Sequence, residues 1–241
     1  RRAWILPATE VVPAQVPTQI KVMSWNIAFG GGLRGEPTEL HPRGEVEQTL
    51  EQIAEHIRAQ APDILFLQEV DRPSRRSGGV DQMTFLLDAL GVHYGCFVTT
   101  WRVNYLPFPY WPLAGHLGGV HSGQAILSRF PIADCERRPL PQPEGNPWWY
   151  NRFFLHRSIQ RARLVIGEGR SLTAVNLHLE AFSKPNRQAQ ARLVAAAIDE
   201  WRAGDPGTPM IVAGDLNAIP TSATLRSPAT TVPIAPTSFA T

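Results

Sequence analysis

The sequence predicts an α/β protein whose strands and helices form separate layers. Short apolar runs bounded by turn residues are typical of buried strands, and they alternate with stretches whose apolar residues recur at helical spacing. Several of these strands follow one another in hairpin order, which argues against an all-parallel sheet. The 241 residues are 43% hydrophobic and 18% charged. This composition suits one large domain with a packed core, which we place at residues 20–241 behind a loose leader at residues 1–19.

The first half of the domain is expected to hold strand, helix, strand and helix in that order. The expected ranges are about 20–25, 45–60, 63–68 and 81–90. The first helix carries its apolar residues on one face and ends before Pro62, and Asp81 is placed to cap the second. Residues 91–122 are rich in aromatic residues, Pro and Gly, so we expect long loops there, followed by a short strand at 125–127.

The second half is expected to form a hairpin, a helix and a final strand. The expected ranges are 157–166, 171–179, about 186–203 and 209–214. In the second arm of the hairpin the residues alternate, so Val175 and Leu177 face one way and Asn176 and His178 the other. After Asn217 the chain turns to Pro, Thr, Ser and Ala, and we expect no clear closing element there.

Four of the expected strands end in polar groups. These groups are Asn26, Glu69, His178, and the pair Asp215 and Asn217. Oxygen ligands of this kind suit Mg²⁺, which takes one or two carboxylates and keeps several waters and substrate phosphates in its shell. The sequence therefore predicts one convergent polar site.

Each of these residues also has a simpler interpretation when taken alone. Glu69 could be a solvated carboxylate or a partner of Arg72, and Gly-Asp-x-Asn is good turn chemistry. His178 could be a satisfied, half-buried histidine, and Asn26 a strand terminator. Glu69 and Asp215 could also pair as the acid and base of a glycoside hydrolase, but that explains neither the amides nor His178.

Five blocks of the sequence match a known family in their order and residue types. They are VMSWNIAFG, DILFLQEVD, SGQAILSRFPI, TAVNLHLE and MIVAGDLNAIP. Together they resemble the signature blocks of the endonuclease/exonuclease/phosphatase superfamily over roughly residues 20–220. The resemblance implies the deoxyribonuclease I-like fold, a four-layer α-β-β-α sandwich of two mixed sheets flanked by helices.

The resemblance also implies roles for individual residues in a Mg²⁺-dependent phosphoester hydrolase, with Mn²⁺ as an alternative metal. Glu69 resembles the principal metal ligand and Asn26 its neighbour in the metal shell. Asp215 resembles the residue that positions the attacking water. The remaining candidates are His178 for the transition state, Asn217 as a phosphate donor, Asn176 as support, and Ser122 and Arg129, which bracket SGQAILSR. For Arg129, a structural salt bridge is an equal alternative to phosphate contact.

The sequence departs from the family at its C-terminal end. The family closes with an Asp-bearing strand and a Ser-Asp-His block, whereas the last His here is His178 and the last Asp is Asp215. We therefore expect a chain that is incomplete at its C-terminus, with closing strands missing, an exposed sheet edge and reduced activity. The alternative is a non-catalytic, phosphate-binding relative, but the intact remaining blocks favour an enzyme.

The substrate class is left open by the sequence. A net charge of +2 is too mild to indicate a polyanionic partner, which favours a sphingomyelinase-like or bacterial hydrolase over a nuclease. The substrate could be a phospholipid headgroup, a nucleic acid or a small phosphodiester. The aromatic segments 101–112 and 148–154 could stack bases, contact a membrane surface or pack their own loops, and the interleaved Arg102, Arg152 and Arg157 suit phosphate.

The remaining expectations concern the environment of the protein. Cys96 and Cys135 have no metal-binding spacing, and we expect two reduced thiols, with a single bridge between them as the alternative. No apolar stretch approaches the roughly 20 residues of a membrane helix. The chain shows no signal-peptide pattern, which favours the cytoplasm, and we expect a monomer.

Overall fold

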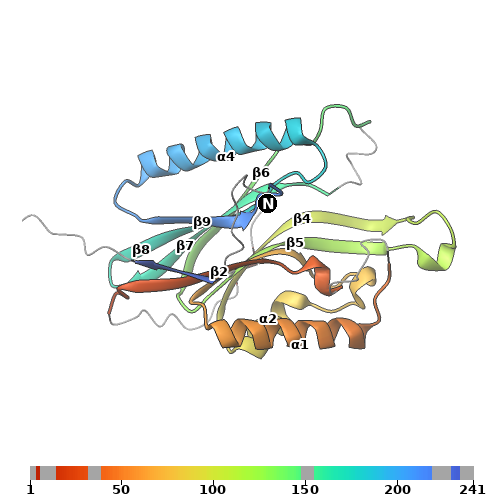
Figure 1. The fold of residues 1–241 in the computed structure, drawn as a ribbon, viewed down its shortest axis with the longest axis horizontal. Helices are drawn as coiled ribbons and strands as arrows, with labels where there is room; N and C mark the ends of the chain where they lie inside the picture. The colour runs from red at the N-terminus through yellow and green to blue at the C-terminus, as the bar shows by residue number, and fades with distance from the viewer. Residues whose placement is uncertain (1–3, 6–14, 32–38, 148–154, 219–228, 234–241) are drawn as a thin grey trace, which may run out of the picture.

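The computed structural model describes residues 4–5, 15–31, 39–147, 155–218 and 229–233. Two β-sheets pack face to face, and helices cover both outer faces (Figure 1). Helices α1 (Arg43–Gln60) and α2 (Gln82–Leu90) lie on one side, and α4 (Lys184–Gly204) lies on the other. This arrangement confirms the predicted α-β-β-α sandwich.

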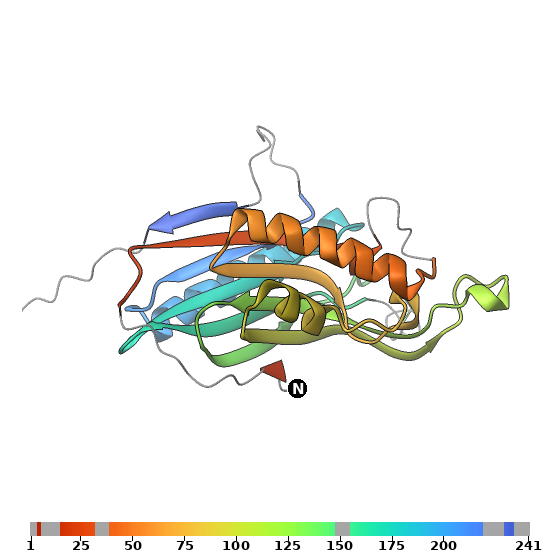
Figure 2. The same cartoon turned by 90° about the horizontal axis from the view of Figure 1, so that it is seen from below.

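The larger sheet has six strands in the order β1-β4-β5-β3-β2-β10. Their bounds, in the same order, are Trp4–Ile5, Tyr94–Leu106, Gly118–Ser128, Ile64–Asp71, Gln19–Asn26 and Ala229–Pro233. Strands β2 and β3 are parallel, and every other neighbouring pair in this sheet is antiparallel. The short β10 lies along β2 at the edge of the sheet (Figure 2).

The smaller sheet has four strands in the order β6-β7-β8-β9. Their bounds are Ile132–Pro139, Ser158–Gly167, Arg170–His178 and Met210–Asp215. Only β8 and β9 are parallel here, and α4 forms the crossover between them. Short 3₁₀ turns at Ala28–Gly30 (η1), Arg75–Ser77 (η2) and Leu113–Gly115 (η3) complete the described elements.

Three hydrophobic cores hold the four layers together, one at each interface. Between the sheets lie residues such as Val22, Phe66, Ile126 and Leu164. Buried residues of α1 and α2 pack on the outer face of the larger sheet, and Val194, Ala197 and Trp201 of α4 pack on the smaller one. The helical spacing predicts this burial, because one stripe of each helix faces a sheet.

The structure corrects several expectations about the elements. Residues 91–122, expected to be loops, contain all of β4 and the start of β5. Their aromatic and β-branched residues favour strands, and this outweighs the Pro and Gly content. Strand β6 was not expected, and neither was β1, which lies within the segment 1–19 assigned as a leader. Strand β10 pairs with β2 where we expected no closing element and an exposed edge.

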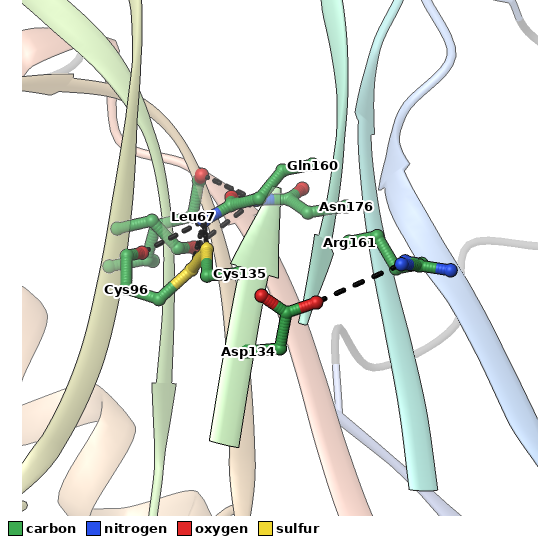
Figure 3. Close-up of a disulfide and its surroundings, with 8 residues drawn as sticks. Leu67, Cys96, Asp134, Cys135, Gln160, Arg161 and Asn176 are labelled. Atoms are coloured by element: carbon green, nitrogen blue, oxygen red, sulfur yellow. Dashed lines mark hydrogen bonds and ion pairs between the residues drawn. A yellow bond between two sulfur atoms is a disulfide. The ribbon is translucent and has the colours of Figure 1, made fainter. Parts of the chain in front are cut away.

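The two cysteines are not reduced thiols, as we had expected, but form a disulfide (Figure 3). Cys96 lies on β4 and Cys135 on β6, so the bond joins the two sheets through the middle core. The Cα atoms are 6.4 Å apart, within the range that a disulfide spans. Gln160 Nε2 donates to the Cys96 carbonyl oxygen at 2.8 Å and to Cys96 Sγ at 3.0 Å. Sequence spacing alone could not reveal this pairing, because it depends on how the sheets face each other.

We expect removal of the disulfide to lower the free energy of unfolding by about 3–4 kcal/mol, because the bond closes a loop of intermediate length in the unfolded chain. The two cysteines are 39 residues apart in the sequence. Denaturant unfolding of the parent chain should respond to reductant, whereas the double variant Cys96→Ala/Cys135→Ala should not. Equal stability of the parent with and without reductant would contradict this expectation.

Candidate active site

The carboxyl ends of the two parallel strand pairs meet at one end of the sandwich. In the larger sheet Asn26 of β2 is level with Gln68 of β3, and in the smaller sheet His178 of β8 is level with Asp215 of β9. Asn26 Nδ2 donates to Glu69 Oε1 at 3.1 Å and to Asp215 Oδ2 at 2.9 Å. Because β2 and β9 belong to different sheets, the second bond joins the two halves of the site directly.

Glu69 projects from an irregular position in β3. The pairing of β3 with β5 shifts register between Gln68 and Val70, so Glu69 has no partner in the ladder. Its φ of 55° is uncommon for a residue with a side chain. A bulge of this kind re-aims a side chain, and such strained positions cluster at functional sites. The Glu69 side chain is 28% exposed, so it lies at the border between core and solvent.

The turn after β2 holds Asn26 in place. Ala28 and Phe29 both have positive φ, and the Ala28 amide donates to Asn26 Oδ1 at 3.1 Å. Gln82, fully buried on α2, donates through Nε2 to the Phe29 carbonyl oxygen. Its Oε1 accepts from the Asp71 amide at 2.8 Å. Gln82 therefore ties the turn that carries Asn26 to the strand end that carries Glu69.

Asp215 depends on the glycine before it. Gly214 has a φ of 136°, and a Cβ there would lie 2.5 Å from the Leu177 nitrogen and 2.8 Å from its carbonyl carbon. Only glycine lets β9 approach β8 this closely. Beyond it, the Asn217 amide donates to Asp215 Oδ1 at 2.9 Å, and Asn217 Nδ2 donates to the Leu179 carbonyl oxygen at 2.8 Å. The Gly-Asp-x-Asn segment is thus a turn, and it is also part of a cluster of polar side chains that contains Asn26, Glu69 and His178.

His178 lies between the two carboxylates and a cation. Its Nε2 is 3.8 Å from Glu69 Oε1 and 3.7 Å from Asp215 Oδ2, and the Arg157 guanidinium contacts the same nitrogen. A guanidinium can only donate, so Nε2 accepts and the imidazole is neutral. Burial, reinforced by the charge of Arg157, lowers the pKa of His178 to about 3, against an opposing effect of Asp215.

Arg157 belongs to this cluster, although the sequence analysis named it only as one of three arginines near the aromatic segments that suit phosphate. It is only 4% exposed, and within the described residues its Nε has no hydrogen-bond partner. Burial lowers the pKa of its guanidinium, and the carboxylates of Glu180, Glu69 and Asp215 oppose this effect. The signal in the sequence was its place in the hairpin, because the next residue, Ser158, pairs with His178.

Three predicted site residues lie outside the cluster. Asn176 is fully buried between the sheets, and Ser122 is 2% exposed and accepts from Arg76 Nη2 at 3.3 Å. Arg129 lies at the opposite end of the larger sheet, where Nη1 pairs with Asp63 at 3.3 Å just before β3 begins. For Arg129 the structure therefore shows the salt-bridge alternative.

The cluster fits a hard divalent cation, although it offers few ligands. Within the described ranges no group of three or more His, Cys, Asp or Glu side chains is arranged to hold a metal ion. Mg²⁺ needs only one or two carboxylates, because waters and substrate phosphates fill its shell. Glu69 and Asp215 supply two carboxylates that share one amide. Asn26 presents Nδ2 to them, so it would have to turn Oδ1 toward the metal to act as a ligand.

We expect Gly214→Ala to destabilise the protein by at least about 2 kcal/mol more than Gly169→Ala, because only the former adds a clash to the backbone strain. Gly169 also has a positive φ of 63°, but a Cβ there would meet nothing within 4 Å. Urea unfolding of both variants measures the difference. Equal losses would mean that β8 and β9 can separate freely at this point.

Because His178 is buried in its neutral form, the protein should be less stable in acid. Its pKa is lowered in the folded state, so the unfolded state binds the proton more tightly, and stability falls as the pH drops from about 6.5 toward 3. We expect a loss of about 2 kcal/mol between pH 7.5 and pH 5 from this residue. His121 and His156 also have lowered pKa values and act with the same sign.

The comparison that isolates His178 is the unfolding free energy of the parent and His178→Gln at both pH values, in EDTA. The variant should show the smaller loss on acidification. An identical loss in both proteins would show that His178 is not held neutral.

Comparison with known proteins shows what the chain resembles. An endonuclease/exonuclease/phosphatase protein from Beutenbergia cavernae DSM 12333 is 24% identical with a TM-score of 0.57, over 83% of this chain and 48% of that one. The human Nocturnin catalytic domain is 26% identical with a TM-score of 0.56, over 88% and 68%. The mannosyl-6-phosphatase Bt3783 of Bacteroides thetaiotaomicron VPI-5482 is 20% identical with a TM-score of 0.54, over 84% and 67%.

This chain therefore spans about half the length of the Beutenbergia protein. No curated protein matches the sequence. The model of the Endonuclease/Exonuclease/phosphatase family matches residues 23–239, which include both carboxylates, His178 and the strand ends that carry them. The chain belongs to the Endonuclease/Exonuclease/phosphatase family.

Proposed function

We propose that this chain hydrolyses a phosphoester bond with the help of a hard divalent cation, Mg²⁺ or Mn²⁺. One observation carries the proposal: Asn26 Nδ2 holds the carboxylates of Glu69 and Asp215, from opposite sheets, at hydrogen-bond distance. Two carboxylates this close repel each other, and a cation beside them would relieve the repulsion. Structural relatives include a mannosyl-6-phosphatase and the Nocturnin catalytic domain with bound sulfate, which is consistent with a phosphoester substrate.

The proposed roles follow from the positions of the side chains. Glu69, with Asn26 beside it, would hold the metal, which when bound supplies charge neutralisation at the phosphoryl oxygens. Asp215 would orient the attacking water, since its Oδ1 is held by the Asn217 amide while its Oδ2 faces Asn26. Arg157, which contacts His178, would add positive charge beside the carboxylates.

Two predicted roles need a change from the arrangement seen here. The Asn217 side-chain amide is bonded to the Leu179 carbonyl oxygen and would have to leave it to donate to a phosphate oxygen. His178 Nε2 accepts from Arg157, so this nitrogen cannot donate to the transition state while that contact persists. Substrate binding that draws the Arg157 guanidinium toward a phosphate would free His178.

The first test is hydrolysis of bis(p-nitrophenyl) phosphate and p-nitrophenyl phosphate with Mg²⁺, with Mn²⁺ and with EDTA. We expect metal-dependent turnover that Glu69→Gln lowers by at least about 100-fold, because it removes the carboxylate while keeping the shape. The matched control is Glu168→Gln, which alters an exposed carboxylate in the turn between β7 and β8. It should leave the rate unchanged.

The pattern of rates decides between the competing functions. Turnover of the diester supports a phosphodiesterase, and turnover of the monoester alone supports a phosphatase. Binding of inorganic phosphate without turnover of either compound would instead favour a non-catalytic relative. Turnover that persists in EDTA, or an equal rate in Glu69→Gln, would overturn the metal-dependent mechanism.

A further inference from the structure

The hairpin formed by β4 and β5 continues past the end of the sheet that carries the candidate site. Register places Trp101 of β4 opposite Ser122 of β5, and Ser122 opposite Asp71, the last residue of β3. Beyond that level the two strands pair only with each other, down to Leu106 opposite Gly118. The hairpin therefore projects from the body, as both views of the fold show (Figures 1 and 2).

The tip of this hairpin exposes large apolar side chains. Those with more than a third of their surface exposed are Tyr105 (54%), Phe108 (39%), Tyr110 (79%), Trp111 (78%) and Leu113 (63%). From Val103 to Ser128 the sequence contains no Asp, Glu, Lys or Arg. The tip is thus uncharged as well as aromatic, which is unusual for a surface in contact with water alone.

Hydrogen bonds hold the tip in a defined shape. The Leu117 amide donates to the Phe108 carbonyl oxygen at 2.8 Å, and Tyr105 Oη lies 2.6 Å from His116 Nδ1. Arg75, at the base, donates to the carbonyl oxygens of His116 and Ala114 at 2.9 and 3.0 Å. The aromatic residues are therefore displayed outward by an ordered scaffold and do not pack the loop onto the sandwich.

We infer that this tip docks the protein on a lipid bilayer by inserting Tyr110 and Trp111 into the headgroup region. Trp and Tyr have an apolar ring body and a polar edge, which suits the boundary between acyl chains and water. The tip projects from the body, so a fluid bilayer can bury it without offering a matching groove. A nucleic acid would need free cations beside the stacking rings to neutralise its phosphates, but residues 103–128 contain no Lys or Arg, and the guanidinium of Arg75 is bonded to the carbonyl oxygens of His116 and Ala114.

Two exposed apolar side chains also follow the strand ends that carry the candidate site. Phe182, four residues after His178, is 84% exposed, and Leu216, directly after Asp215, is 48% exposed. Apolar exposure at this end of the molecule is therefore not confined to the hairpin tip. The other aromatic segment, which includes Trp148, lies outside the described residues and adds nothing to the argument.

Within the described ranges, none of the helices combines the length and the apolar character of a membrane span. The inferred association is thus a surface contact made by side chains of a hairpin. It stands apart from the proposed hydrolysis, because binding can be measured with Glu69→Gln, which lacks the metal carboxylate. Failure of one proposal leaves the other intact.

The experiment is sedimentation of the full chain with phosphatidylcholine vesicles, at low and at 0.5 M salt. We expect binding that persists at high salt, because apolar insertion is not screened. Tyr110→Ser/Trp111→Ser should lower the partition coefficient by at least about tenfold. The matched control is Leu193→Ser, which removes a 48% exposed apolar side chain from α4. It should bind as the parent does.

A second measurement follows the position of Trp111 directly. Brominated lipids should quench the tryptophan fluorescence of the parent more than that of Trp111→Phe. Trp111→Phe and the double Ser variant should both keep the parent's melting temperature. No sedimentation of the parent, or equal binding by the double Ser variant, would overturn the inference. The inference would also be overturned if the double Ser variant lost binding to single-stranded DNA, or lost self-association in solution, but bound vesicles as the parent does.

Discussion

The hydrogen bonds of Asn176 fix the spacing of the two sheets at the end that carries the candidate site. From the smaller sheet, its Nδ2 reaches the carbonyl oxygens of Leu67 at 2.9 Å and Ala125 at 3.1 Å in the larger sheet, and its Oδ1 accepts from Gln68 Nε2 at 2.6 Å. Buried amides of this kind are costly unless satisfied, so the sheets have one favourable separation here. Glu69 follows Gln68 directly, and its approach to Asp215 depends on that separation.

Burial, as well as ion pairing, sets the charge state of the residues in the candidate site. Arg157 is buried against His178, which remains neutral beside the two carboxylates, so the cluster presents two anionic groups and one desolvated cation. A further cation beside the two carboxylates would stabilise such a cluster, and so would an anion close to the Arg157 guanidinium. A phosphate with its metal would provide both, which links the electrostatics of the cluster to the proposed substrate class.

Much of the fold could be predicted from local patterns, and the errors have physical reasons. The faces of α1 and α4 and the ends of β2, β3, β8 and β9 follow from periodicity within single segments. The disulfide depends on how the two sheets face each other, which no local pattern reports, whereas Arg157 meets His178 across the β7-β8 hairpin of one sheet. Asn176 and His178 share one face of β8, as predicted, but Asn176 lies two residues deeper and meets the opposite sheet rather than solvent.

The two sheets repeat one pairing scheme. Along β4-β5-β3-β2 the neighbours are antiparallel, antiparallel and parallel, and β6-β7-β8-β9 repeats the same series, with a helix crossing over each parallel pair. Each half ends in amides and one carboxylate, Asn26 with Glu69 and Asn217 with Asp215. The site thus lies where the carboxyl ends of the two parallel strand pairs, one from each sheet, come together. Because Asn26 of one sheet bonds to Asp215 of the other, the cluster exists only when the two sheets are packed together, and a change that shifts one sheet against the other would disturb the site without altering any of its residues.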